Sequence, residues 1–194
     1  MDNMGLDLKV LDLNPGLKGW YSSGLRFLLR PERDHGEPGD APLEASSAEI
    51  PFPEPWSRIY NSRSCRCTSV WTYWQLPIDL GPQASVERKR LFQNIVSALN
   101  WPQEHLVFWP LSAIKSEGLL PRTDLFLQGI LLMKPLYILC FGDQAFASLF
   151  PENSKEYGLF KLDQINYIYL PGPEDMLPDN KQAKRIVWST LKNL

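Results

Sequence analysis

Histidine is nearly absent from the sequence, which has only two among its 194 residues. Few histidines are therefore available as metal ligands or as acid–base catalysts that titrate near neutral pH. His35 lies in a segment rich in proline and acidic residues, and His105 precedes an expected strand. In a parallel sheet that is the end opposite to the usual site. We therefore expect both histidines to be surface residues.

Cysteine is also scarce, with three in the chain. Cys65 and Cys67 could bind a soft metal ion, but no second Cys or His pair follows at ligand spacing. Cys140 lies in an apolar run and is expected to be a buried thiol. The sequence therefore predicts no disulfide framework, no metal and no cofactor.

Long apolar runs and nucleotide-binding motifs are missing as well. No apolar run reaches the roughly 18 residues of a membrane span, and no signal peptide is recognisable. No Gly-rich phosphate loop follows an expected strand, and no nucleophile elbow is present. We expect a cytoplasmic protein that binds no membrane, outside the phosphate-loop and serine-hydrolase classes.

The net charge of −2 is unevenly distributed. Residues 31–55 hold seven acidic residues against Arg33 alone, together with six of the 17 prolines, and so predict a disordered or extended linker. Residues 56–194 carry a charge of +3, which is too mild to indicate strong non-specific DNA binding. We expect DNA binding to be weak or absent.

Residues 1–30 are unusually rich in large apolar side chains for a free tail. We consider Trp20, Leu25, Phe27 and Leu28 candidates for docking on a protein partner, with residues 31–55 as the tether. The same segment could instead be a short element packed on the domain, or simply disordered. The pattern alone leaves these alternatives open.

Residues 56–194 alternate between strand and helix patterns. Strands are expected at residues 68–74, 106–109, 136–141 and 165–170. Helices are expected at residues 85–100, at 123–133 with Thr123 as the cap, at 143–149, and near the end of the chain. This alternation predicts an α/β domain with three layers, α/β/α, around a short central parallel sheet.

In such sheets the functional site lies beyond the carboxyl ends of the strands. The corresponding loops supply the pocket candidates Gln75, Pro77, Pro110, Ser112, Gly142 and Asp143. The loop after the last strand and the basic residues that follow it supply the DNA-contact candidates Pro171, Gly172, Pro173, Lys181, Lys184 and Arg185. The basic run at residues 88–90 is either a solvated helix face or a patch that contacts phosphate.

Three stretches resemble the uracil-DNA glycosylase superfamily and follow its order. Residues 125–150 match its helix, apolar strand, Gly and second helix, and residues 106–110 match a strand that ends on Pro. Residues 170–191 match its final loop, which enters the DNA minor groove, and the helix after it. The resemblance covers about residues 68–194 and implies the glycosylase-like α/β/α fold.

The residues that carry the chemistry of this superfamily are replaced here. Gln75 stands where an acid orients the attacking water, and Leu170 stands where a His stabilises the departing base. Asp79 is the nearest carboxylate, but no motif places it at the water. Loss of the acid and loss of the His would each lower the rate on the order of 100-fold or more, so we name no residue of this chain as catalytic. Because some mismatch-type members carry Asn in place of the acid, a divergent glycosylase for uracil or another altered base stays the alternative.

The chain also resembles the psi subunits of bacterial DNA polymerase III clamp loaders, a catalytically silent family of the same fold. Residues 24–31, behind Trp20, are similar to the N-terminal peptide with which these subunits dock on the clamp loader. Residues 96–108 and 170–177 are similar as well. The resemblance implies a non-catalytic protein-interaction or scaffold subunit in bacterial DNA replication or repair, with a clamp-loader-like subunit as partner.

Overall fold

The structure is a computed structural model that describes residues 52–62, 67–102, 105–152, 156–162 and 164–194. The candidate docking residues of the N-terminal segment, together with His35 and Cys65, lie outside these ranges. The described residues belong to one compact unit, which begins at Ile50.

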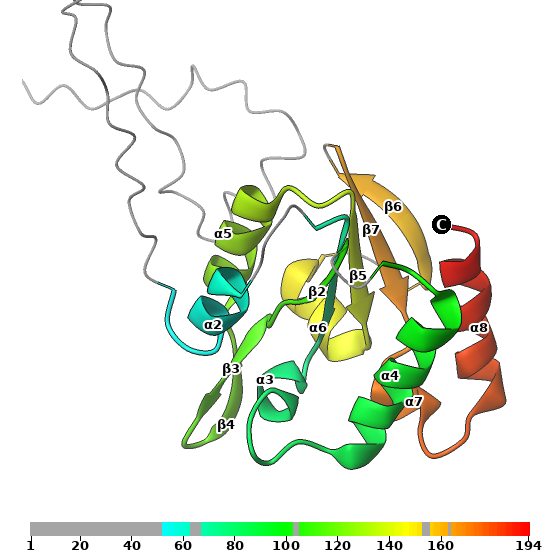
Figure 1. The fold of residues 1–194 in the computed structure, drawn as a ribbon, viewed down its shortest axis with the longest axis horizontal. Coiled ribbons are helices and arrows are strands. Elements are labelled where there is room, and N and C mark those ends of the chain that lie inside the picture. Colours follow the sequence, from blue (N-terminus) through cyan, green and yellow to red (C-terminus); the bar gives the residue numbers. More distant parts are fainter. Residues whose placement is uncertain (1–51, 63–66, 103–104, 153–155, 163) are drawn as a thin grey trace, which may run out of the picture. The chain divides into compact units, whose positions relative to one another are not determined.

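A five-stranded sheet forms the centre of the domain, in the order β2-β1-β5-β7-β6 (Figure 1). Its strands are β1 (Ser69–Tyr73), β2 (Leu106–Phe108), β5 (Tyr137–Phe141), β6 (Gly158–Leu162) and β7 (Ile165–Leu170). The first four in that order run parallel, and β6 returns antiparallel beside β7. The expected strands all form, whereas β6 was not expected.

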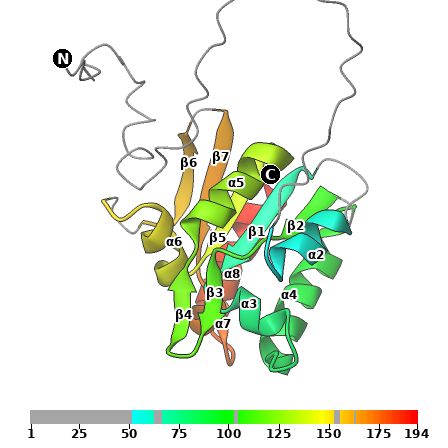
Figure 2. The ribbon, with the colours of Figure 1, turned by 90° about the vertical axis from the view of Figure 1, so that its left-hand side faces the viewer.

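Helices cover both faces of this sheet (Figure 2). On one face, α4 (Val86–Leu99) and α8 (Lys181–Lys192) pack against Trp71, Leu139 and Ile168 of the strands. On the other face lie α5 (Thr123–Met133) and α6 (Asp143–Leu149), with Phe146 of α6 stacked on Tyr169. The domain is therefore an α/β fold with a mostly parallel sheet flanked by helices, as the alternation predicts.

Short elements complete the described part of the chain. They are α2 (Trp56–Asn61), α3 (Leu76–Asp79), α7 (Pro173–Met176), and a hairpin of β3 (Ser112–Lys115) with β4 (Gly118–Pro121). Ser112 was expected in a loop, but it begins a strand because it pairs with Pro121. The hairpin, α3 and α7 gather at the lower end of the sheet in Figure 2.

Local capping explains where the main helices begin and end. The Ser85 side chain accepts the Arg88 N–H at the start of α4, and Asn100 ends it in a left-handed conformation. The expectation that Thr123 caps α5 is wrong: the cap position is Arg122, which makes no side-chain cap hydrogen bond, and Thr123 is already helical. Asn180 caps α8 by accepting the N–H groups of Gln182 and Ala183.

The N-terminal end of the described chain packs on the domain. Phe52 is buried and contacts the rings of Tyr60 and Trp109. The indole of Trp56 donates a 2.8 Å hydrogen bond to the carbonyl of Pro110. Residues 52–55, which sequence analysis assigns to the linker, therefore lie within the compact unit. Among the helices of the described residues, none is long and apolar enough to cross a membrane.

Candidate functional site

The carboxyl ends of three parallel strands meet at one edge of the sheet. Tyr73, Phe141 and Leu170 are register partners at the ends of β1, β5 and β7. The Gly142 N–H donates a 2.9 Å hydrogen bond to the Leu170 carbonyl, so the loops after β5 and β7 are directly joined. The pocket candidates Gln75 and Gly142 and the loop beginning at Pro171 therefore all follow this edge, which we call the central edge.

Glu174 occupies the space above β5 and β7 at the central edge. A Cβ at either Gly142 or Gly172 would meet the Glu174 carboxylate, so a side chain at either position would displace the end of this side chain. Gly142 also has a φ of 90°, a conformation that favours glycine. The two glycines make room for a side chain of the protein itself.

Acidic groups surround Glu174. Asp143 begins α6 and accepts a hydrogen bond from the Tyr169 hydroxyl, and Asp175 accepts the Gly172 N–H at 2.8 Å. Burial raises the pKa of Glu174, and the nearby charges of Asp175 and Asp143 raise it further. The central edge is therefore negatively charged near β7, which disfavours the phosphates of DNA.

Leu170 lies in the core and not at the surface. Its side chain is 0% exposed and belongs to the cluster that contains Phe141, Ile168 and Val187. Pro171, Gly172 and Pro173, which sequence analysis proposes as DNA contacts, are buried as well. The last loop therefore packs against the domain.

Most other pocket candidates have structural contacts. The Ser112 hydroxyl donates a 2.6 Å hydrogen bond to the Trp74 carbonyl, and Pro77 is buried in α3. Gln75 differs, because its Oε1 is buried and has no hydrogen-bond partner in the described part of the chain. An unpaired buried carbonyl oxygen is costly, and it could accept a hydrogen bond from a bound water.

Asp79 is the centre of a buried network that sequence reasoning missed. Its carboxylate accepts the Tyr73 hydroxyl at 2.9 Å, the Ser85 N–H at 2.8 Å, and the Arg88 guanidinium through Nε at 2.7 Å and Nη2 at 2.8 Å. Burial and the Asp79 charge raise the pKa of Tyr73. Arg88 is thus a structural partner, and each Asp79 carboxylate oxygen already accepts two hydrogen bonds. Asp79 and Arg88 lie nine residues apart, and no recognised sequence motif has an Asp and an Arg at this spacing.

The basic candidates after the last loop lie on the surface of α8. Lys181 and Arg185 are exposed, whereas Lys184 forms a 2.8 Å ion pair with Asp179. Lys184 also lowers the pKa of Asp179. One of the three expected phosphate contacts therefore already has a protein counter-ion.

No metal site is found in the described ranges, where no three His, Cys, Asp or Glu residues converge. Cys67 and Cys140 are buried and unbridged, and burial raises the pKa of the Cys140 thiol. His105 is exposed before β2, as expected.

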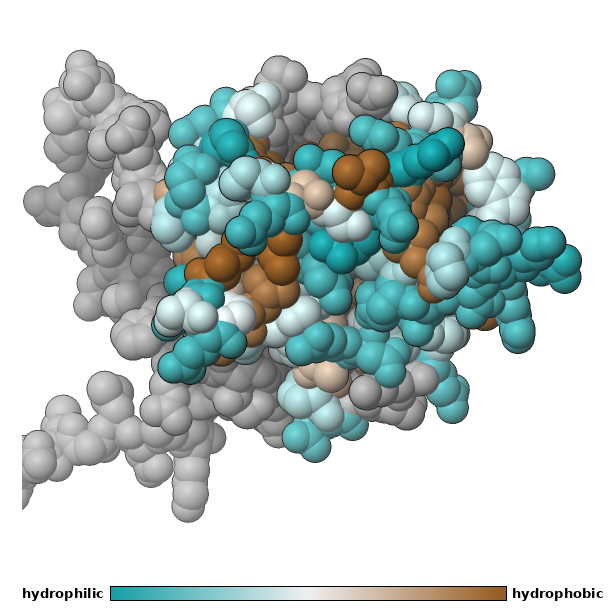
Figure 3. Space-filling model, turned by 90° about the horizontal axis from the view of Figure 1, so that it is seen from below, coloured by the Kyte–Doolittle hydropathy of each residue, from teal (hydrophilic) through white to brown (hydrophobic). Residues whose placement is uncertain are grey.

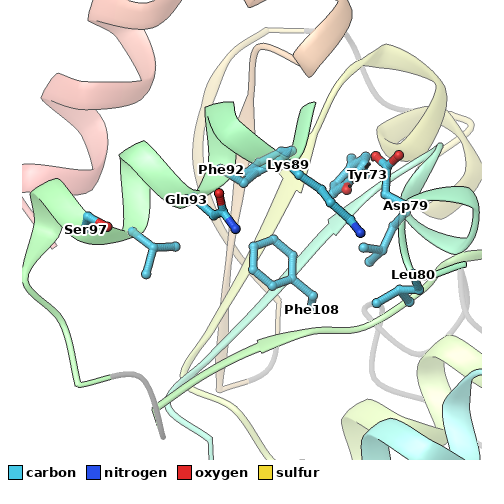
Figure 4. A pocket seen from close by; sticks show the side chains of 10 residues that line it. Tyr73, Asp79, Leu80, Lys89, Phe92, Gln93, Ser97 and Phe108 are labelled. Carbon is cyan, nitrogen blue, oxygen red and sulfur yellow. Dashed lines mark hydrogen bonds between the residues drawn. The ribbon is translucent and has the colours of Figure 1, made fainter. Parts of the chain in front are cut away.

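Two cavities lie beside α4. The larger, of about 380 Å³, is bounded by α4, α3 and β2 (Figure 4), and the smaller, of about 260 Å³, lies between α4 and α8. Neither is lined by Gln75, Gly142 or Leu170. Viewed from the lower end, apolar surface is divided into patches by hydrophilic side chains (Figure 3).

The comparisons with known proteins identify no family. No protein-family model matches the chain, and no curated protein is detectably similar in sequence.

Proposed function

We propose that this chain is a non-catalytic domain of the uracil-DNA glycosylase-like type, which acts as a protein-interaction or scaffold subunit in DNA replication or repair. The observation that supports this most is Leu170, which is 0% exposed at the position where the resemblance requires a catalytic His. A residue with no solvent-facing atom cannot stabilise a departing base.

The surroundings of Leu170 support the same proposal. A glycosylase that flips its target base needs a pocket in which that base can be read. Here the Glu174 side chain covers Gly142 and Gly172, and the acidic residues Asp143 and Asp175 lie nearby. An acidic side chain over these glycines leaves less room for a flipped base and opposes the phosphate backbone.

The alternative is a divergent glycosylase that excises uracil or another altered base, and Gln75 is the observation that favours it. Its buried, unpaired Oε1 could orient a water molecule, although it cannot accept a proton as a carboxylate does. The two proposals therefore differ in whether Gln75 contributes to any reaction.

An excision assay separates the two. The full chain is incubated in excess over single-stranded and mispaired uracil DNA, and abasic sites are quantified against a buffer control. We expect no excision above the control. Excision that clearly exceeds it and is lost in Gln75→Ala would establish the alternative.

The scaffold role is tested through the N-terminal segment. The full chain and the double variant Trp20→Ala/Phe27→Ala are titrated against a reconstituted bacterial clamp-loader complex. We expect the wild type to bind and the double variant to bind at least about tenfold more weakly, because buried aromatic anchors dominate protein interfaces. Equal binding by both would remove this segment from the proposal.

DNA affinity gives an independent measurement. With at most three phosphate contacts, from Lys181, Lys184 and Arg185, the log–log salt slope should be only about −2 to −3. Charge reversal at Lys184 and Arg185 should flatten this slope. Sub-micromolar binding at physiological salt that survives the reversal would contradict the expected weak binding.

A further inference from the structure

A second surface lies along the opposite flank of the sheet, beside β2. Within the described ranges β2 pairs with β1 alone and forms the end of the sheet. The His105 carbonyl accepts the N–H of Thr68, which directly precedes β1, and the Trp109 N–H donates to the Trp71 carbonyl of β1. Since backbone groups alternate along a strand, the N–H and C=O of Leu106 and Phe108 point to the outer side. These groups can pair with a further strand.

The larger cavity adjoins this edge. The Phe108 side chain of β2 lines it together with Leu76, Leu80, Phe92 and Val96, which gives a largely apolar wall. In Figure 4, Lys89 and Gln93 extend from α4 toward Phe108. At about 380 Å³ the cavity can hold one or two large apolar side chains.

The rim of the cavity is cationic. Lys89 is exposed, and the Arg58 guanidinium donates a 3.1 Å hydrogen bond to the carbonyl of Leu80, a lining residue. The one carboxylate among the lining residues, Asp79, is already neutralised by Arg88. The charges of Lys89 and Arg58 are therefore not compensated by a lining residue, and they favour an acidic occupant.

We propose that the β2 edge docks an extended, acidic segment of a partner protein. The segment adds to the sheet by pairing with the outer groups of Leu106 and Phe108, as in other cases of strand addition. It inserts one apolar side chain into the cavity and places a carboxylate beside Lys89 and Arg58. This surface, the β2 groove, can be tested separately from the proposed function, because Gln75, Gly142 and Leu170 do not line its cavity. Tyr73, at the end of β1, borders both regions.

The first experiment is an unbiased selection. A phage-displayed library of random peptides of about 12 residues, long enough to span a sheet edge, is panned on the immobilised full chain. We expect enriched peptides to combine an acidic residue with a large apolar residue a few positions away. Failure to enrich such peptides, or enrichment of basic ones, overturns the proposal.

Enriched peptides are then labelled and titrated by fluorescence anisotropy against matched variants. Lys89→Glu should weaken binding by about tenfold or more, because it reverses the charge at the groove. Arg90→Glu makes the same charge change on α4 away from the lining residues, and should leave the Kd within about a factor of two. Gln93→Trp should also abolish binding by filling the cavity. Equal effects of Lys89→Glu and Arg90→Glu contradict a specific groove.

Strand addition has its own readout. Amide exchange followed by NMR should slow at Leu106 and Phe108 when the peptide binds, because their N–H groups gain partners. Unchanged exchange there overturns the proposed pairing. Light scattering of the full chain reveals the other possible occupant: a dimer that Lys89→Glu dissociates would assign the groove to a second copy and overturn the proposal.

Discussion

The central edge and the β2 groove lie on the same sheet but differ in what fills them. At the central edge, Leu170 is part of the core and Glu174 covers two glycines. At the β2 groove, apolar side chains line a cavity and two cations on its rim lack an acidic partner among the lining residues. The space above β5 and β7 is thus taken by a side chain of the protein itself, while a cavity lies open beside β2.

This difference has a physical consequence for each region. Leu170 at the central edge is buried in the core, and Asp79 beside that edge is held by four hydrogen bonds, so changes at these two residues should cost folding free energy. Lys89 and Gln93 at the β2 groove are exposed on α4, so changes at these two residues should affect binding more than stability.

The largest effect is expected for Leu170→His, which restores the residue that the resemblance requires. The histidine would be buried in an apolar cluster without a hydrogen-bond partner. The free energy of unfolding should therefore fall by roughly 3–5 kcal/mol. Urea denaturation followed by tryptophan fluorescence measures it. Leu170→Met keeps the volume and should cost less than about 1.5 kcal/mol. A stable Leu170→His protein that excises uracil would show that the central edge is open.

The next largest effect is expected for Asp79→Asn, at the boundary between the two regions. The side-chain NH₂ group of Asn would face donors, because Arg88 and the Ser85 N–H both donate to Asp79. This should lower the free energy of unfolding by about 2–3 kcal/mol. Asp124→Asn breaks the exposed Arg122–Asp124 pair and should cost less than about 1 kcal/mol. Comparable losses in the two variants would mean that the buried network contributes little to the fold.

A smaller, pH-dependent effect is expected for Glu174→Gln. Because the folded state raises the pKa of Glu174 above 4.5, the proton is held more tightly in the folded than in the unfolded protein. The resulting stabilisation is complete below pH 4.5 and is lost as pH rises through the folded pKa. At pH 7 the Gln variant should be the more stable, by less than about 1 kcal/mol because the side chain is partly exposed.

The measurement is a series of urea denaturations between pH 4 and pH 8. Glu117→Gln, at the exposed turn of the β3–β4 hairpin, is the matched control for the loss of one carboxylate and should keep the unfolding free energy at pH 7 within about 0.5 kcal/mol of the wild type. A Glu174→Gln variant that is less stable than the wild type at pH 7 would show that the carboxylate is stabilised at the central edge.

The main elements could be predicted because their signals are local. Periodicity and the Ser85 cap define α4, and the apolar runs after residues 135 and 164 define β5 and β7. The short elements lack such signals. β6 is not followed by an Asn-Gly turn, and α3 is a single turn that contains Pro77. The hairpin of β3 and β4 has a turn of Ser116 and Glu117, which is not a typical hairpin dipeptide.

The sequence could predict where the candidate site lies but not which side chains occupy it. Sequence reasoning puts Gln75, Gly142 and the loop after Leu170 at one edge, because parallel strands end together. It cannot tell that Glu174 turns back over two glycines, since that depends on the path of the loop. Nor can it find the β2 groove, whose lining residues lie up to 35 residues apart in the sequence, from Tyr73 to Phe108.

The smallest stability effect is expected for Gln93→Trp, the variant that should abolish peptide binding at the β2 groove. Gln93 is exposed on α4 and lines the cavity beside Phe108. A tryptophan there can bury part of its ring against Phe108 and Val96, while helix propensity changes little. The unfolding free energy should therefore stay within about 0.5 kcal/mol of the wild type. Urea denaturation checks this, and a loss above about 1 kcal/mol would mean that the groove is a closed part of the core. Unchanged stability with lost binding would show that this hollow is dispensable for the fold, in contrast to the filled central edge.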